Sequence, residues 1–166
     1  MPNLKTNKSI VINTSPWIAL SLCKQTSIIK KLYNNVFIPE TVRNEILAGG
    51  NKGIGVHELH KADWLNVEKV KDIQKINLLY ELEKGEAEVI VLAIEKGINQ
   101  VLIDEKIARQ QAKILNLNVI GTLGLLLKAK NKGLIKELKP LIKSIVDGGY
   151  WIKDNIIEAI LKEAGE

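Results

Sequence analysis

SIVINTSPW, residues 9–17 of the chain, runs from an apolar stretch through a turn into the start of a helix. The β-branched residues 9–12 predict a short buried strand. Ser15 followed by Pro16 predicts the helix start, with Ser15 as the N-cap and Pro16 in the first helical position. Asn13 therefore lies at the carboxyl end of a strand, where the chain turns into the helix.

The same alternation of strand and helix continues along the chain. Further strands are predicted at residues 36–38, 65–67, 101–103 and 118–120. Helices are predicted at residues 28–32, 40–48, 57–62, 85–96, 106–115 and 123–129, and a helical pattern interrupted by Gly148 and Gly149 covers residues 134–166. Because parallel strands need such crossover helices, we expect an α/β fold with three layers, α/β/α, around a central parallel sheet of four or five strands. One domain is expected over residues 1–166, with residues 134–166 as a helical C-terminal extension packed on it.

The composition narrows the class of protein. Of the 166 residues, 46% are hydrophobic and 26% are charged, which indicates a globular core and excludes a disordered chain. The single cysteine, Cys23, excludes an internal disulfide framework and any CxxC motif, which fits a reducing compartment. No apolar run approaches the ~20 residues of a membrane helix, and residues 1–13 lack the features of a secretory signal. We therefore expect a cytoplasmic protein with no membrane association.

The net charge and the glycine patterns indicate which classes of ligand suit the chain. The net charge is 24 − 19 = +5, which gives mild support to a polyanionic partner such as nucleic acid. Neither the GxGxxG pattern of dinucleotide sites nor the GxxxxGK pattern of phosphate loops occurs, which argues against both kinds of nucleotide site. The glycine-rich residues 49–55 predict a mobile loop.

Polar side chains follow the predicted strands at their carboxyl ends, where open α/β sheets form their sites. Asn13, Asp104 and Thr122 occupy these positions, and Glu45 and Glu86 lie on neighbouring helices. Converging carboxylates repel one another, so such a cluster normally needs a counter-charge such as Mg²⁺ or Mn²⁺. Between carboxylates and a substrate phosphate, such an ion polarises the phosphoryl oxygen and lowers the pKa of a bound water. This arrangement predicts a phosphodiesterase.

Four fragments in this order resemble the PIN domain, and more narrowly its DUF3368 branch. They are VINTSPWIAL at residues 11–20, GEAE at 85–88, LIDE at 102–105 and VIGTLG at 119–124. The GGYW stretch at residues 148–151 resembles the glycine-aromatic end of that branch. The resemblance runs over nearly the whole chain.

The resemblance implies a PIN fold and a metal-dependent endoribonuclease, as in the toxins of type II toxin-antitoxin modules. The expected cofactor is Mg²⁺ or Mn²⁺, the expected substrate is single-stranded RNA, and the expected partners are a small antitoxin or regulatory protein and a second copy in a homodimer. The residues that fall on the four acidic positions, and are expected to be catalytic, are Asn13, Glu45, Glu86 and Asp104, of which Glu45, Glu86 and Asp104 are the expected metal ligands. The expected accessory residues are Thr14, Ser15, Glu105 and Thr122.

Asn13 departs from the pattern of the family, because most PIN nucleases have Asp there, although Asn also occurs in this branch. An amide oxygen can still bind a metal, but the site keeps three carboxylates in place of four. Weaker cation binding is therefore expected. A slow nuclease, a nuclease that needs more metal, and a nucleic-acid-binding or regulatory module without cleavage all remain open.

Each site residue also has a structural interpretation. Glu86 in the first turn of a helix suits the helix dipole, and Glu45 can be a solvated helix residue. Asp104 can be the N-cap of the helix that follows it, and Asn13 can simply complete the turn after its strand.

Other residues offer weaker hypotheses. His57, His60 and Asp63 share a helical face that could hold zinc, although surface residues suit the pattern better. Cys23 could be a nucleophile or a core residue, and the latter is expected. Lysines could form an RNA-facing patch or a solvated surface, namely Lys128, Lys130, Lys132, Lys136, Lys139 and Lys143. Tyr150 and Trp151 could stack on bases or pack the terminal helix. A phospho-acceptor receiver domain is disfavoured, because it needs an acidic pair after the first strand.

Overall fold

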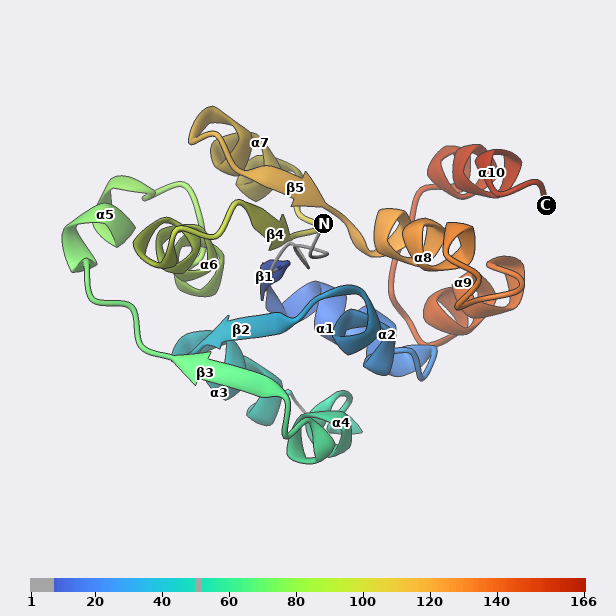
Figure 1. Cartoon of the computed structure of the whole chain (residues 1–166), viewed down its shortest axis with the longest axis horizontal. Helices are drawn as coiled ribbons and strands as arrows, with labels where there is room; N and C mark the ends of the chain where they lie inside the picture. Colours follow the sequence, from blue (N-terminus) through green and yellow to red (C-terminus); the bar gives the residue numbers. More distant parts are fainter. Residues whose placement is uncertain (1–7, 50–51) are drawn as a thin grey trace, which may run out of the picture.

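A five-stranded parallel sheet forms the centre of the computed structural model, which describes residues 8–49 and 52–166 (Figure 1). Its strands are β1 (Ser9–Ile12), β2 (Asn35–Pro39), β3 (Leu65–Glu68), β4 (Gln100–Leu102) and β5 (Asn118–Ile120). The strand order is β3-β2-β1-β4-β5, so the chain builds outward on one side of β1 and then crosses to the other. The carboxyl ends of β1 and β4 therefore flank the point where the order reverses, which is where such sheets place their sites.

The helices complete the three predicted layers. They are α1 (Thr14–Leu22), α2 (Ser27–Leu32), α3 (Glu40–Leu47), α4 (Val56–Lys61), α5 (Ile73–Leu78), α6 (Lys84–Lys96), α7 (Lys106–Ile114), α8 (Thr122–Asn131), α9 (Lys139–Asp147) and α10 (Asp154–Glu163). Figure 1 shows α6 on one side of the sheet and α1, α2 and α8 on the other. Outside that second layer, α9 contacts α1 and α10 contacts α8. Within residues 8–49 and 52–166, no helix has the length and apolar character needed to cross a membrane.

The predicted loop at residues 49–55 is only partly visible, because positions 50 and 51 lie outside the described residues. The predicted apolar helix after Gly85 is found as α6. Residues 87–93 are all buried, and Gly97 ends the helix in the left-handed conformation at φ +64°. The apolar run in the sequence therefore reflects a helix that is covered on several sides.

Helix α1 begins earlier than the sequence predicts. Asn13 is the N-cap, with extended backbone at φ −87° and ψ 167°, and Pro16 is the third helical residue. The Ser15 hydroxyl donates to the Glu105 carboxylate and does not cap the helix. The prediction of Ser15 as N-cap is therefore wrong, because a tertiary hydrogen bond claims its side chain.

The C-terminal helices also begin later than predicted. Residues 134–138 are not helical, and α9 starts at Lys139. Gly133 leaves α8 in the left-handed conformation at φ +74°, and Pro140 lies in the first turn of α9, where its fixed φ suits a helix start. Glycine and proline thus delay the helix by five positions.

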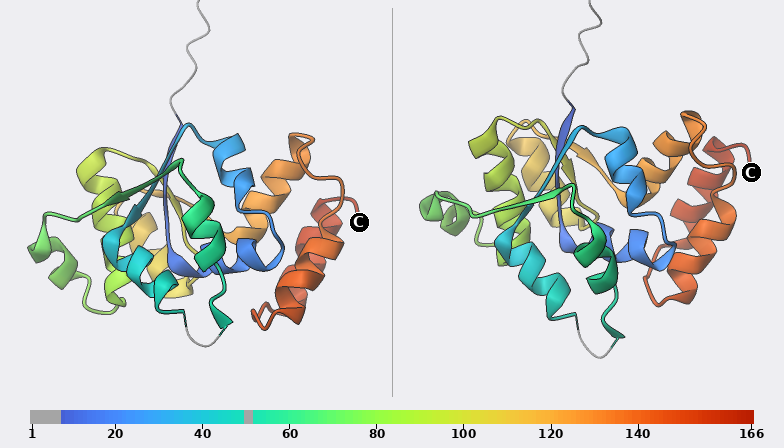
Figure 2. Two further views of the ribbon diagram at one scale, coloured as in Figure 1. Left: turned by 90° about the horizontal axis from the view of Figure 1, so that it is seen from below. Right: turned by 60° about the horizontal axis from the view of Figure 1, so that its bottom comes forward.

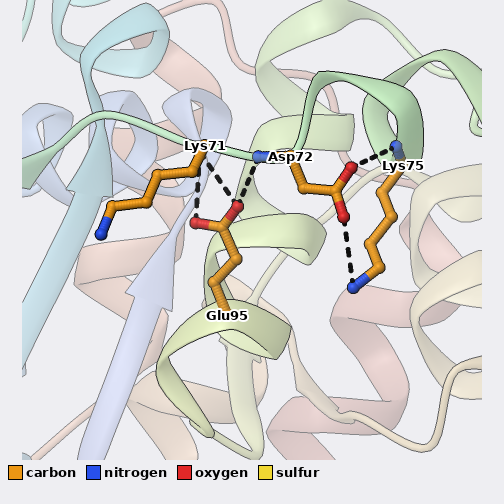
Figure 3. A network of polar contacts seen from close by, with 4 residues as sticks. All are labelled: Lys71, Asp72, Lys75 and Glu95. Atoms are coloured by element: carbon orange, nitrogen blue, oxygen red, sulfur yellow. Dashed lines mark hydrogen bonds and ion pairs between the residues drawn. The ribbon is translucent and has the colours of Figure 1, made fainter.

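Helix α5 was not predicted, and a polar network joins it to α6 (Figure 3). The Glu95 carboxylate accepts hydrogen bonds from the main-chain N–H groups of Lys71 at 3.0 Å and Asp72 at 2.7 Å. Asp72 in turn is the N-cap of α5 and accepts from the Lys75 N–H at 3.0 Å. Figure 1 shows α5 at one end of the molecule and α9 and α10 at the other.

Candidate active site

The turn after β1 contacts carboxylates from two separate segments. The Thr14 hydroxyl donates to Glu45 of α3. The Ser15 hydroxyl donates to Glu105, the residue before α7, and the Asn13 side-chain amide donates to the same carboxylate at 3.1 Å. Three consecutive residues therefore hold two acids that are 60 positions apart in the sequence.

Glu45 has room to reach this turn because Gly85, the second residue of α6, lies beside its carboxylate. A Cβ atom on Gly85 would stand only 2.9 Å from the carboxyl carbon of Glu45. The Glu45 side chain is half-buried, so the interpretation as a freely solvated helix residue does not hold. The sequence placed Glu45 near the site, and the structure brings it there through Gly85 and Thr14.

Glu86 has the structural role at the start of a helix, and it also lies near other acids. Its carboxylate accepts a hydrogen bond from the Glu83 N–H at 3.2 Å, as part of a capping box that starts α6. Burial raises the pKa of Glu86, and the nearby charges of Glu105, Glu83 and Glu45 raise it further, against the opposing effect of the hydrogen bond from the Glu83 N–H. Glu45, Glu86 and Glu105 therefore lie close enough for their charges to interact.

Asp104 is held by three donors. Its Oδ1 accepts from the Thr122 N–H at 2.7 Å, and its Oδ2 accepts from the Thr122 hydroxyl at 2.6 Å and from the Tyr150 hydroxyl at 2.5 Å. Asp104 thus ties the end of β4 to the start of α8 and to the link between α9 and α10. The N-cap of α7 is Glu105 and not Asp104, so the capping interpretation fails for that helix.

Tyr150 is a site residue that the sequence did not identify as a hydrogen-bond donor. Burial raises the pKa of its hydroxyl, and the charge of Asp104 and the hydrogen bond to it act in the same direction. The sequence offered two roles for this aromatic residue, stacking or packing. Its contact with Asp104 joins residues 46 positions apart and depends on how α9 packs.

Arg109 is the second residue that the sequence missed. Its Nη1 donates to the main-chain carbonyl of Ile103 at 2.7 Å. A Cβ on Gly121 would lie 2.8 Å from that nitrogen and 3.0 Å from Oδ1 of Asp104, so the glycine allows the guanidinium and the carboxylate to approach. The i, i+4 spacing from Glu105 was the available sequence signal.

The oxygen donors suit a hard divalent cation in type, because carboxylate and amide oxygens are the ligands of Mg²⁺ and Mn²⁺. The Asn13 Oδ1 atom is buried and has no hydrogen-bond partner among the described residues. In residues 8–49 and 52–166, however, no group of three or more His, Cys, Asp or Glu side chains is placed to hold a metal ion. The chemistry of the donors therefore fits such an ion, whereas no three acids stand in ligand positions in this conformation.

The structure supports the expected roles of the two histidines and of Cys23, whereas the RNA-facing lysine patch stays a prediction. His57, His60 and Asp63 are exposed, and in the described part of the chain they form no group of three side chains placed to hold zinc. Cys23 is a buried core residue, and burial raises the pKa of its thiol to about 11, so the thiol is protonated at neutral pH. In the lysine cluster, Lys130 pairs with Glu166 at 2.5 Å, Lys143 pairs with Asp147, and the Lys128 Nζ lies 4.7 Å from the centre of the Tyr33 ring.

Comparison with known proteins identifies the family. A search of curated proteins gives no match to the chain. The family model DUF3368, described as a PIN domain, matches residues 9–166, which includes all five strands and the C-terminal helices. The chain therefore belongs to the DUF3368 family of PIN domains.

Proposed function

We propose that the chain is a metal-dependent endoribonuclease of the PIN type, and that it acts as the toxin of a toxin-antitoxin module. PIN domains are generally nucleases that depend on a divalent metal. The observation that supports this function most directly is the turn Asn13 to Ser15, which gathers Glu45 on one side and Glu105 on the other. These acids meet beside β1 and β4, at the reversal of the strand order.

The reaction is the hydrolysis of an RNA phosphodiester by water. Glu45, Glu86 and Asp104 would hold Mg²⁺ or Mn²⁺, with Asn13 as a neutral donor. When bound, this ion supplies charge stabilisation at the phosphate and a more acidic water. The hydroxyls of Thr14 and Ser15 orient the acids of the site.

Positive charge in the same site comes from Arg109. Its guanidinium has one N–H engaged with the Ile103 carbonyl, and among the described residues no hydrogen bond occupies the others. A guanidinium recognises phosphate oxygens through several parallel N–H groups. We therefore assign Arg109 to binding the phosphate that is cleaved or its neighbour.

The test compares cleavage of a single-stranded RNA oligonucleotide at millimolar Mn²⁺. Asp104→Asn is expected to lower the rate severely, whereas Asn13→Asp is expected to equal or exceed the wild type, because it restores a fourth carboxylate. The exposed Asp63→Asn variant is the control for loss of a carboxylate outside the site. If the wild type cleaves no faster than Asp104→Asn, catalysis is rejected.

A second candidate function is a non-catalytic nucleic-acid-binding or regulatory module. It is favoured by one observation, that no three acids among the described residues stand in ligand positions. RNA binding that weakens with salt, persists in EDTA and is accompanied by no cleavage would support this function over the first.

We also propose a small antitoxin or regulatory protein that covers the acidic mouth of the site, and a homodimer as the assembled form. Light scattering of the purified chain tests the dimer, and a monomeric mass at micromolar concentration would reject it.

A further inference from the structure

The link between α9 and α10, residues 148–153, lies against the candidate active site. Figure 1 shows it passing beside the start of α8. Its Tyr150 hydroxyl donates to Asp104 at 2.5 Å, and its Tyr150 N–H donates to the Ile145 carbonyl at 3.2 Å. Both the side chain and the main chain of Tyr150 are therefore fixed.

Two glycines bring the link into this position. A Cβ on Gly148 would lie 3.0 Å from Cδ1 of Leu22 in α1, so only glycine lets the link pass that close without moving Leu22. Gly149 has φ +95°, a conformation that side chains rarely adopt. Figure 2 shows α9 beside α1 in both views, which agrees with this close approach.

Trp151 follows directly and is unlike the other tryptophans. Its side chain is 77% exposed, whereas Trp17 is fully buried and lies 6.1 Å from the ring of Trp64. Among the described residues, no ring contact involves Trp151. Because consecutive Cα atoms are about 3.8 Å apart, the exposed indole is attached to the chain one residue after Tyr150, whose hydroxyl binds Asp104.

Resting on the proposed function, we infer that Trp151 is a stacking platform for a base of the RNA strand whose phosphate is bound by Arg109. Single-stranded nucleic acids combine phosphates, which bind cations, with bases, which stack on aromatic rings. An exposed indole, a guanidinium and a net charge of +5 match that combination.

The binding test uses a fluorescein-labelled ten-nucleotide single-stranded RNA in EDTA, so that cleavage does not interfere. Trp151→Ala is expected to raise Kd about 5- to 150-fold, the range for loss of one stacked base, while Trp151→Phe keeps Kd within about threefold. The slope of binding against salt should not change, because stacking neutralises no phosphate. The matched control is Tyr80→Ala, which removes an aromatic residue that is 83% exposed and follows α5 at the opposite end of the molecule (Figure 1).

A second measurement reports on the indole itself. Unlabelled RNA should quench the tryptophan emission of the wild type, and this quenching should disappear in Trp151→Phe, although that variant still binds. Trp17 and Trp64 remain as the internal reference in both proteins. Because Trp151 is exposed, both variants should melt at the wild-type temperature.

The outcomes separate this inference from the proposed function. Cleavage by the wild type together with an unchanged Kd for Trp151→Ala overturns the platform and leaves the nuclease. Trp151-dependent binding without cleavage supports the platform and overturns the nuclease. No binding by the wild type in EDTA overturns the platform, whereas the nuclease is decided by the cleavage test at millimolar Mn²⁺. A change of Trp151 emission with protein concentration alone overturns the platform in favour of an interface between copies of the chain.

Discussion

Three hydrogen-bond donors converge on the carboxylate of Asp104, so we expect this residue to contribute to the stability of the fold as well as to the candidate site. Asp104→Asn replaces one acceptor oxygen with an NH₂ group, so at least one donor from Thr122 or Tyr150 loses its partner. We expect the free energy of unfolding to fall by about 1–3 kcal/mol, measured by urea denaturation. The exposed Asp63→Asn control should stay within about 0.5 kcal/mol, and an unchanged Asp104→Asn would contradict the three-donor arrangement.

Gly85 controls the position of Glu45. In Gly85→Ala the new Cβ would contact the Glu45 carboxylate, which is the movable end of a side chain and can swing aside. Stability should therefore change by less than about 1 kcal/mol, while Mn²⁺ affinity measured by calorimetry should fall. Combining Gly85→Ala with Glu45→Ala completes a double-mutant cycle. Without the Glu45 carboxylate, the alanine at position 85 should have no effect on Mn²⁺ binding.

The residues of the site were predicted in part. Asn13, Glu45, Glu86 and Asp104 could be placed near one edge of the sheet, because strand ends and helix starts are visible in the sequence. Their hydrogen bonds could not, since these depend on side-chain rotamers. Glu105 was expected only as an accessory residue.

A single carboxylate, that of Glu166, binds the start of helix α9. The Glu166 carboxylate accepts from the Leu138 N–H at 2.6 Å and the Lys139 N–H at 2.8 Å, at the start of α9, and pairs with Lys130. The hydrogen bond from Lys130 is the largest cause that lowers the pKa of Glu166, from 4.5 to about 2.

A lowered pKa means that the stabilisation is complete above about pH 4.5 and is lost as the pH falls toward 2. The free energy of unfolding is measured by urea denaturation at two chosen values, pH 5 and pH 3. The wild type should lose more of it between these values than Glu166→Gln does. Glu163→Gln, an exposed change on α10, is the control and should behave like the wild type. Parallel losses in all three proteins would contradict this role.

Helix α5 depends on its neighbour. Glu95→Ala removes the acceptor for the N–H groups of Lys71 and Asp72 (Figure 3). We expect faster hydrogen exchange at these two amides and little change in the exchange of the strands. Glu81→Ala, which changes an exposed residue, is the control. Equal exchange in the two variants would show that Glu95 does not hold this segment.

At the scale of elements, the strands could be predicted because each contains a short apolar stretch with at least one β-branched residue. Helix α5 was missed because one acceptor at its start, Glu95, lies on another helix, so that its hydrogen bonds with the Lys71 and Asp72 N–H groups depend on tertiary packing. The start of α1 was misplaced because the hydroxyl of Ser15 is used by Glu105.

At the scale of the whole molecule, α9 is attached to the rest of the fold through its buried contacts with α1. Ile145 is fully buried on α9, whereas its neighbour Val146 is 40% exposed. Ile145→Ala should cost about 2–5 kcal/mol of unfolding free energy, and Val146→Ala should cost far less. Similar melting temperatures for the two variants would mean that α9 is not packed on the body.

The α/β class followed from the alternation of elements, but the strand order did not. Local patterns contain no information on which strands pair, so the position of β1 between β2 and β4 was visible only in the structure. The contact between Tyr150 and Asp104 likewise could not be predicted from local patterns in the sequence.

The distance along the chain between Asn13 and Tyr150 has a consequence for protein synthesis. A ribosome adds about 5–20 residues per second, so on the order of 7–27 s pass between translation of the first and the last of these residues. Nascent chains halted before position 150 lack the hydroxyl that anchors Asp104. The candidate site is thus assembled late, when almost the whole polypeptide has been made.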